Sequence, residues 1–112
     1  MRVTTEFYVS ALVRRVFASG GFAAVERHGA REAGAVFIRQ RFRDGRESLY
    51  GPAPQSSFGE DDDDRRFEPR VTRGDAADCE AVLTRETRFD PDLWLVELET
   101  DDVSGLFPVA ES

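Results

Sequence analysis

Lysine is absent from this chain of 112 residues, so all fifteen of its basic residues are arginine. The chain also has one cysteine, Cys79, and one histidine, His28. A single cysteine excludes an internal disulfide, and a single histidine excludes metal sites built from several histidines. The use of arginine alone is typical of a biased genome composition, although the guanidinium group also favours planar, bidentate contacts.

Long hydrophobic runs are missing as well. No stretch approaches the roughly 18 apolar residues that a membrane-spanning helix requires. The first residues, Met-Arg-Val-Thr-Thr-Glu, lack the apolar core of a secretory signal peptide. Together with the single cysteine, these absences favour a cytoplasmic protein without membrane contact.

The charges are divided unevenly along the chain, whose net charge is −7. Residues 1–59 carry nine arginines and five acidic residues, whereas residues 60–112 carry six arginines and seventeen acidic residues. We expect the two halves to attract each other within one fold. The net negative charge also disfavours binding to nucleic acid, which is a polyanion.

The apolar spacing predicts two helices. The first covers Thr5–Ala18 and ends at a pair of glycines, and the second follows an N-cap at Asp75 and runs to about Arg88. Three residues of the first helix lie opposite its main apolar face: Phe7, Ala11 and Ala18. We expect this second face either to contact another subunit of a homodimer or to be exposed to solvent.

Alternation of apolar and polar residues predicts five strands. They are Phe22–Arg27, Ala35–Phe42, Glu47–Tyr50, Phe67–Thr72 and Leu93–Glu99. The first three are expected to form a meander, and Pro69 places the fourth at a sheet edge. The turn at Asp44–Gly45 is either a two-residue type I′ loop or part of a three-residue loop with a glycine bulge. These alternatives differ by one residue in register, and the sequence leaves both open.

These elements predict an α+β fold in the order α-β-β-β-β-α-β, with a mostly antiparallel sheet of four to five strands and two helices on one face. The length is that of a single domain, residues 1–112, whose ordered core we place at about residues 3–100. An acidic loop is expected at residues 59–66 and a loose tail at residues 101–112. Within that tail, Leu106–Phe107 is apolar enough to dock.

Four segments of the chain together carry a resemblance to a known family: Tyr8–Arg15, Gly34–Ile38, Leu49–Ser56 and Arg85–Glu97. Through them the chain resembles a small alphaproteobacterial family that is catalogued as a domain of unknown function, family 1491. The resemblance covers about Val3–Glu99 and implies a single intact domain in a bacterial cytoplasm. It implies no activity, cofactor or catalytic residue.

Arginine recurs at every second position near the end of the second predicted strand, which places three guanidinium groups in a row. A rigid exit rich in glycine and proline follows the return strand. The predicted binding residues are Arg39, Arg41, Arg43, Tyr50, Pro52, Pro54 and Gln55. Two alternatives remain open. The row could bind the phosphates of a nucleic acid or a small anion, or it could pair with acidic residues such as Glu97 and Glu99 inside the fold.

Glu86 continues the apolar stripe of the second helix, where a carboxylate must be paired or solvated. We expect a structural ion pair with Arg15 or Arg88. A functional role of this carboxylate, together with Asp90 or Asp92, is the basis of a less favoured enzyme hypothesis. We predict no catalytic residue.

The other polar candidates have simpler explanations. The run Glu60–Asp64 lacks the spaced ligands and the turn glycine of a calcium loop, and it is more acidic than the corresponding loop of the resembled family. Cys79 lies on the apolar stripe of the second helix and is expected to be buried and unreactive. His28 lies in a loop bounded by glycines and is expected at the surface. We therefore expect no metal and no cofactor.

The sequence thus favours a non-enzymatic protein-interaction module that uses the hairpin of residues 34–56 and its Gly/Pro exit. The expected partner is another protein or a second copy of the chain. Nucleic acid is the less favoured partner.

Overall fold

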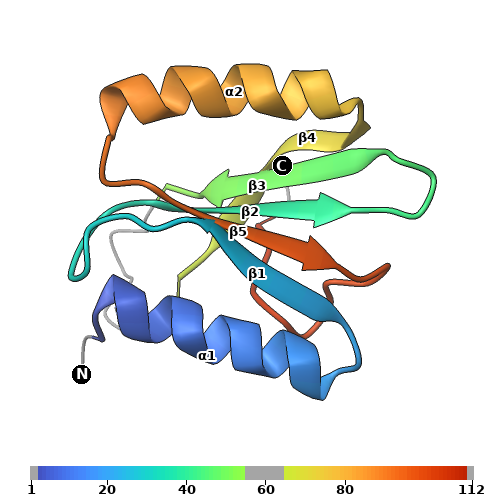
Figure 1. The fold of residues 1–112 in the computed structure, drawn as a ribbon, viewed down its shortest axis with the longest axis horizontal. Coiled ribbons are helices and arrows are strands. Elements are labelled where there is room, and N and C mark those ends of the chain that lie inside the picture. The colour runs from blue at the N-terminus through green and yellow to red at the C-terminus, as the bar shows by residue number, and fades with distance from the viewer. Residues whose placement is uncertain (1–2, 55–64, 111–112) are drawn as a thin grey trace.

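The computed structural model describes residues 3–54 and 65–110, and these form two helices and one five-stranded sheet (Figure 1). The elements are α1 (Thr5–Ala18), β1 (Phe22–Arg27), β2 (Val36–Arg41), β3 (Glu47–Pro52), β4 (Phe67–Gly74), α2 (Ala76–Phe89) and β5 (Trp94–Glu99). The predicted α+β class and the predicted order of elements are confirmed.

Both helices begin at the residues that the sequence indicated. The hydroxyl group of Thr4 accepts a hydrogen bond of 3.1 Å from the backbone N–H of Phe7 at the start of α1. At the start of α2, the carboxylate of Asp78 accepts a hydrogen bond of 3.3 Å from the backbone N–H of Asp75. These side chains satisfy backbone donors that have no partner within the first turn of a helix.

The strands lie in the order β1-β5-β2-β3-β4. β2 and β5 run parallel to each other, and the other neighbouring strands are antiparallel. The predicted meander is therefore wrong at its first step, because β5 lies between β1 and β2. From the edge strand β4 the chain passes through α2 to β5 in the middle of the sheet. A parallel pair of strands requires a long connection of this kind.

The β2–β3 turn is the three-residue alternative. The backbone N–H of Phe42 donates to the carbonyl of Arg46 at 3.0 Å, and the N–H of Gly45 donates to the carbonyl of Phe42 at 3.1 Å. Gly45 has a φ of 91°, a left-handed conformation that favours glycine. In the resulting register, Arg41 lies opposite Glu47.

The end of β3 and the C-terminal tail both differ from what was predicted. β3 runs to Pro52, two residues further than predicted, because Pro52 lies beyond the last pairing with β2 and still pairs with β4 at Phe67. The tail is not loose throughout, because Leu106 and Phe107 are buried against the core and so dock as the sequence allowed.

The two helices lie on opposite faces of the sheet, with α2 above it and α1 below it in Figure 1. The prediction of two helices on one face is therefore wrong. The reason is that the central strands carry apolar residues on both faces: Val36 and Ile38 pack on the α1 side, and Phe37 packs on the α2 side. A strand that is buried on both faces shows a continuous apolar run instead of alternation.

The two faces are not covered equally. On the α1 side, the helix and the segment around Leu106 and Phe107 complete the core together. On the α2 side, the helix lies mainly over β3 and β4. Five strands span about 19 Å at a spacing of about 4.8 Å, whereas one helix covers about 10 Å. Leu95 of β5 is still buried beneath α2, but the α2 side of β1 and of β5 beyond Leu95 has no helix above it in the described part of the chain.

Candidate functional site

Arg39, in the middle of β2, is buried under α2 and is only 3% exposed. Its Nε lies 3.1 Å from Glu47 Oε1, its Nη1 lies 3.2 Å from Glu26 Oε1, and its Nη2 contacts the carboxylate of Glu80. These three carboxylates come from β3, β1 and α2. A single guanidinium group thus connects the helix to two strands of the sheet.

Arg41 lies two residues further along the same face, and its side chain is 42% exposed. Its Nε lies 3.3 Å from Glu97 Oε2 and 3.4 Å from Glu47 Oε2, and its Nη2 lies 3.7 Å from Glu26 Oε2. We call the set the ionic cluster: Arg39, Arg41, Glu26, Glu47, Glu80 and Glu97. Since these four carboxylates share two guanidinium groups, the cluster has an excess of two negative charges when all its members are ionised.

The pKa values of Arg39 and Glu97 are both raised. Burial tends to lower the pKa of Arg39, but the hydrogen bond to Glu80 and the charges of Glu26 and Glu47 outweigh it and raise that pKa. Burial raises the pKa of Glu97; Arg41 opposes this rise, and the neighbouring carboxylate of Glu26 adds to it. A cation placed beside Glu97 would favour the ionised form that burial disfavours.

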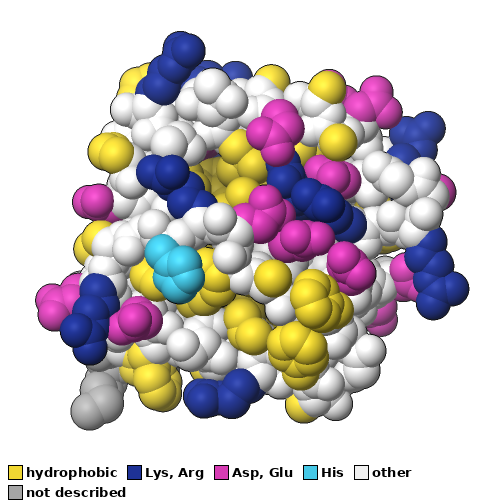
Figure 2. All heavy atoms as spheres, in the orientation of Figure 1, with side chains coloured by type: hydrophobic (Ala, Val, Ile, Leu, Met, Phe, Trp, Pro, Cys, Tyr) yellow, Lys and Arg dark blue, Asp and Glu magenta, His cyan; other side chains and the backbone are white. Residues whose placement is uncertain are grey.

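The cluster borders the uncovered part of the sheet. We call this part the β1–β5 surface, and it is formed by the residues of these strands that point to the α2 side: Phe22, Ala24, Glu26, Arg27, Glu97 and Glu99, together with the buried Leu95. Figure 2 shows basic and acidic side chains next to one another at the centre of this view, with hydrophobic side chains on either side. A groove of about 440 Å³ runs between this surface and α2, and its walls include Glu26, Glu80, Leu83, Thr84 and Leu95.

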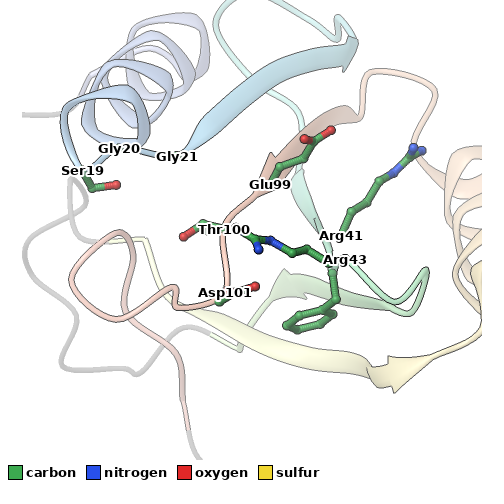
Figure 3. Close-up of a pocket in the computed structure, with 9 residues that line it drawn as sticks. Ser19, Gly20, Gly21, Arg41, Arg43, Glu99, Thr100 and Asp101 are labelled. Carbon is green, nitrogen blue, oxygen red and sulfur yellow. The ribbon is translucent and has the colours of Figure 1, made fainter.

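A second hollow, of about 530 Å³, lies at the tip of the β2–β3 hairpin. It is bounded by Arg41–Arg43, by Ser19–Gly21 after α1 and by Glu99–Asp101 after β5. In Figure 3, Arg43 extends toward Thr100, whereas Arg41 points away from the hollow, toward the α2 side. The hollow is polar and carries charges of both signs.

The predicted binding residues do not form one surface. Arg39 and Arg41 belong to the ionic cluster, while Arg43 is exposed in the turn and has no hydrogen-bond or ion-pair partner among the described residues. Tyr50 points to the opposite face, where its ring packs edge-on against Phe107 at 5.3 Å. The remaining three lie in or after the exit: Pro52 is half-buried, Pro54 is exposed, and Gln55 lies outside the described residues.

Glu86 is half-buried and near a cation, but the predicted partners are wrong. Its Oε2 lies 3.6 Å from Nη1 of Arg70 on β4. Arg15 cannot reach it, because α1 lies on the other face, where the Nε of Arg15 donates to the carbonyl of Leu106 at 3.1 Å. Arg88 is exposed and forms no ion pair with any described residue.

The remaining candidate residues have structural roles or stand alone. Asp90 accepts hydrogen bonds from the backbone N–H groups of Ala35 at 3.1 Å and of Asp92 at 3.0 Å, so it organises the turn before β5. Burial, followed by the charge of Glu47, raises the pKa of Cys79 to about 11. His28 is exposed, and its ring lies 5.2 Å from that of Trp94. Glu86 and Asp90 have different contacts, and the enzyme hypothesis that joins them with Asp92 stays a prediction.

The described residues contain no cluster of three or more His, Cys, Asp or Glu side chains that could hold a metal ion. The acidic run Glu60–Asp64 lies outside the described residues. Neither helix in the described part of the chain is long and apolar enough to cross a membrane.

The second face of α1 is partly open. Phe7 and Ala18 are exposed, and Ala11 is half-buried. Phe7 and Ala11 border a groove of about 490 Å³ between α1 and the segment Gly105–Pro108. Contact of this face with a second subunit stays a prediction.

The sequence analysis missed three members of the ionic cluster: Glu26, Glu47 and Glu80. Glu47 carried a usable signal, since the three-residue turn places it opposite Arg41. Glu26 and Glu80 carried none, because β1 is separated from β2 in the sheet by β5, and the sequence does not specify which face α2 covers.

Comparison with known proteins supplies the family. The profile of DUF1491, described as a protein of unknown function, matches residues 3–108. The chain belongs to this family. The resemblance inferred from the four sequence segments is thereby confirmed. A search of curated proteins found no match.

Solved structures of similar proteins share the fold. The solution structure of protein Atu0922 from A. tumefaciens is 56% identical in sequence, with a TM-score of 0.88 over 100% of this chain and 98% of that chain. The crystal structure of a DUF1491 family protein from Caulobacter crescentus is 32% identical, with a TM-score of 0.78 over 99% of this chain and 100% of that one. An NMR structure of a DUF1491 family protein from the same organism is 33% identical, with a TM-score of 0.79 over 99% of each chain.

Proposed function

We propose that this DUF1491 chain is a non-enzymatic protein-interaction module, and that it receives a basic, amphipathic helix of a partner protein on the β1–β5 surface. The observation that carries the proposal is the uncovered half of the sheet beside α2. This part of the sheet is bordered by α2 on one side, and a groove of about 440 Å³ runs between the two. A partner helix there would complete the second layer of the fold.

The chemistry of the surface supports a cationic partner. The ionic cluster has two more carboxylates than guanidinium groups, and the carboxylate of Glu97 has a raised pKa. Lysine or arginine side chains of a partner could supply the missing charge. Beside the charges, the exposed ring of Phe22 and the half-buried Ala24 offer apolar contact area, and an amphipathic helix needs both charged and apolar contacts.

In this proposal most of the β2–β3 hairpin does not contact the partner directly, but it positions the residues that do. Arg39 and Arg41 hold the carboxylates of Glu26, Glu47 and Glu97 in place, so the hairpin organises the surface from below. Held side chains lose less conformational freedom when a partner binds, which favours affinity.

The test compares two arginine substitutions on α2. Thr84 lines the groove, whereas Ala81 is an exposed position of the same helix outside it. Affinity capture from the native cell with the wild type, Thr84→Arg and Ala81→Arg as baits should give a partner that is lost with Thr84→Arg and retained with Ala81→Arg. Both variants add one positive charge, so an unspecific charge effect would weaken both equally.

Two further results are expected if the proposal holds. Cross-linking should place a basic segment of the partner against the β1–β5 surface, and the affinity should fall with rising salt concentration. Equal capture by all three baits, or contact by an acidic segment, would show that the surface is not the binding site.

A second candidate function is the binding of a small anion at the hairpin tip. It is supported by Arg43, which is exposed, lines the hollow and has no ionic partner among the described residues. Inorganic phosphate is a suitable probe. Phosphate-induced NMR shifts at Arg43 and Thr100 that disappear in Arg43→Ser would support it, and unchanged spectra of the wild type would exclude it.

A further inference from the structure

β1 is an edge strand with a free side. In the described part of the chain it pairs with β5 alone. The backbone groups of Phe22–Arg27 form no hydrogen bond to any other described segment. Such a row of unpaired N–H and C=O groups is a template for another strand.

The opposite edge of the sheet is protected by several devices. Pro69 removes a backbone donor from β4. At the start of β4, the N–H of Phe67 donates to the carbonyl of Pro108 at 3.0 Å, and the N–H of Ala110 donates to the carbonyl of Phe67 at 2.7 Å. β1 has no proline, and its one irregularity is a register shift between Val25 and Arg27. The regular part of β1 is therefore available for pairing.

The side chains at this edge are apolar. The regular part of β1 reads Phe22-Ala23-Ala24-Val25. The ring of Phe22 packs edge-on against that of Phe17, with 5.6 Å between their centroids. These two rings are 46% and 51% exposed, although a charged or polar residue is the usual protection of a free edge. The charged residues of β1, Glu26 and Arg27, lie at the register shift, so the exposed aromatic pair lies beside the uncharged part of the edge and indicates an interaction site there.

We propose that β1 pairs antiparallel with β1 of a second copy of the chain, about a twofold axis near Ala23. Pairing about Ala23 uses Gly21–Val25, which ends before the register shift. It places Phe22 opposite Ala24 of the partner subunit, so that the two Phe22 rings are diagonal neighbours across the pair of strands. Glu26 lies outside this ladder, and therefore no like charges face each other across it.

A second copy fits this edge better than a strand of another protein with a different composition. The two small alanines allow close approach of identical strands, and the twofold axis brings both pairs of aromatic rings into one apolar contact. Each chain supplies the same surface, so the partner needs no feature that is absent from this sequence.

The pairing would also enlarge the proposed binding surface. A twofold axis perpendicular to the sheet keeps both α2 helices on the same side. The two β1–β5 surfaces would then form one continuous sheet surface, with an α2 helix along each of its outer edges. This enlarged surface rests on the proposed function, whereas the pairing of the β1 edges does not.

Analytical ultracentrifugation of two lysine variants tests the pairing. Phe22→Lys places a charge on the β1 edge, and Phe7→Lys places the same charge on the exposed second face of α1. We expect the wild type and Phe7→Lys to shift from the mass of one chain toward twice that mass as concentration rises. Phe22→Lys should stay at the mass of one chain over the same range.

Amide hydrogen exchange of the wild type provides a readout that does not depend on the folding of a variant. The amides of residues 21–25 should become more protected at high protein concentration, while those of α1 should not change. A wild type that stays monomeric, a dimer that survives Phe22→Lys, or concentration-dependent protection confined to α1 would each overturn the pairing.

Failure of the pairing and failure of the proposed function can be separated. The ultracentrifugation of the wild type and the capture with Thr84→Arg and Ala81→Arg are independent measurements, and all these chains keep Phe22. If the wild type is monomeric but capture still distinguishes the two substitutions, the interaction surface stands and the pairing falls. If the chain pairs but all baits capture the same proteins, the opposite holds.

Discussion

Arg39 and Glu47 form an ion pair inside the protein, with 3.1 Å between Nε and Oε1 and with side chains that are only 3% and 7% exposed. Two charges this deeply buried are tolerated because each is paired and because further contacts join them to Glu26, Glu80 and Arg41. The pair therefore decides how the α2 side of the sheet responds to substitution.

Replacing Arg39 by methionine should lower the free energy of unfolding by about 3–5 kcal/mol, because it leaves the buried carboxylate of Glu47 with only the half-exposed Arg41 as a cation. Urea unfolding of the purified variant measures this loss. Arg41→Met is the matched control, since its side chain is 42% exposed and the expected loss is only about 0–1 kcal/mol. Similar losses for the two variants would contradict the unequal burial of the two arginines.

The same pair allows a rescue. In the Arg39→Met background, replacing Glu47 by leucine removes a buried carboxylate that has lost its closest cation, and it should recover part of the lost stability, since replacing both partners of a buried pair is often neutral. Failure of any rescue would mean that Glu26 or Glu80 carries the penalty instead. Arg39 is for this reason a poor position at which to test partner binding.

The elements of this fold could be predicted from the sequence, but their arrangement could not. The start and end of α1 follow from the Thr4 cap and the Gly20–Gly21 pair, which are local signals. The insertion of β5 between β1 and β2 depends on contacts between distant segments, for which the sequence has no local signal. The continuous apolar runs at Val36–Ile38 and Trp94–Val96 were the available sign that both sheet faces are covered.

The candidate site shows the same limit. The row of arginines in β2 was visible in the sequence, and one of the stated alternatives was pairing with acidic residues such as Glu97. What the sequence could not show is that α2 covers this face and brings Glu80 onto Arg39. A charged residue in a central strand is solvated or buried according to the layer above it, and that layer is set by the topology.

Two glycines should respond very differently to alanine. At Gly29, a Cβ atom would lie 1.9 Å from the carbonyl oxygen of Asp92 and 2.6 Å from Cδ1 of Trp94, so backbone and core must both move. We expect Gly29→Ala to cost about 3 kcal/mol in unfolding free energy. At Gly45 the Cβ would meet no atom within 4 Å, and the cost of the φ of 91° alone is about 1–2 kcal/mol. Chemical denaturation of both variants checks which one loses more unfolding free energy. A larger loss for Gly45→Ala than for Gly29→Ala would contradict the prediction.

Cys79 should react slowly with thiol reagents in the folded protein. Burial raises the pKa of its thiol to about 11, and the side chain is fully covered by the core between α2 and the sheet. Since the thiolate is the reactive form, modification at neutral pH should require unfolding. Absorbance assays with and without urea measure both rates. Fast labelling of the native protein would show that α2 opens readily or that the thiol is accessible.

Glu97 should make the stability of the wild type depend on pH in a defined direction. Burial raises the pKa of its carboxyl group in the folded state, so the folded chain binds this proton more tightly than the unfolded chain. The resulting stabilisation is present below the pKa of the unfolded chain and is lost as the pH rises through the raised pKa. Glu97→Gln removes this term, and its free energy of unfolding should therefore change less than that of the wild type from acidic to neutral pH.

Urea unfolding at a series of pH values checks this difference, with Glu32→Gln as the control because Glu32 is an exposed acid outside the cluster. A cationic partner helix would favour the ionised form of Glu97, so its affinity should rise over the same pH range in the wild type and in Glu32→Gln but less in Glu97→Gln. If Glu97→Gln kept the pH slopes of the wild type for both stability and binding, ionisation of Glu97 would be coupled to neither folding nor partner binding, and contact between a cationic partner and Glu97 would be excluded.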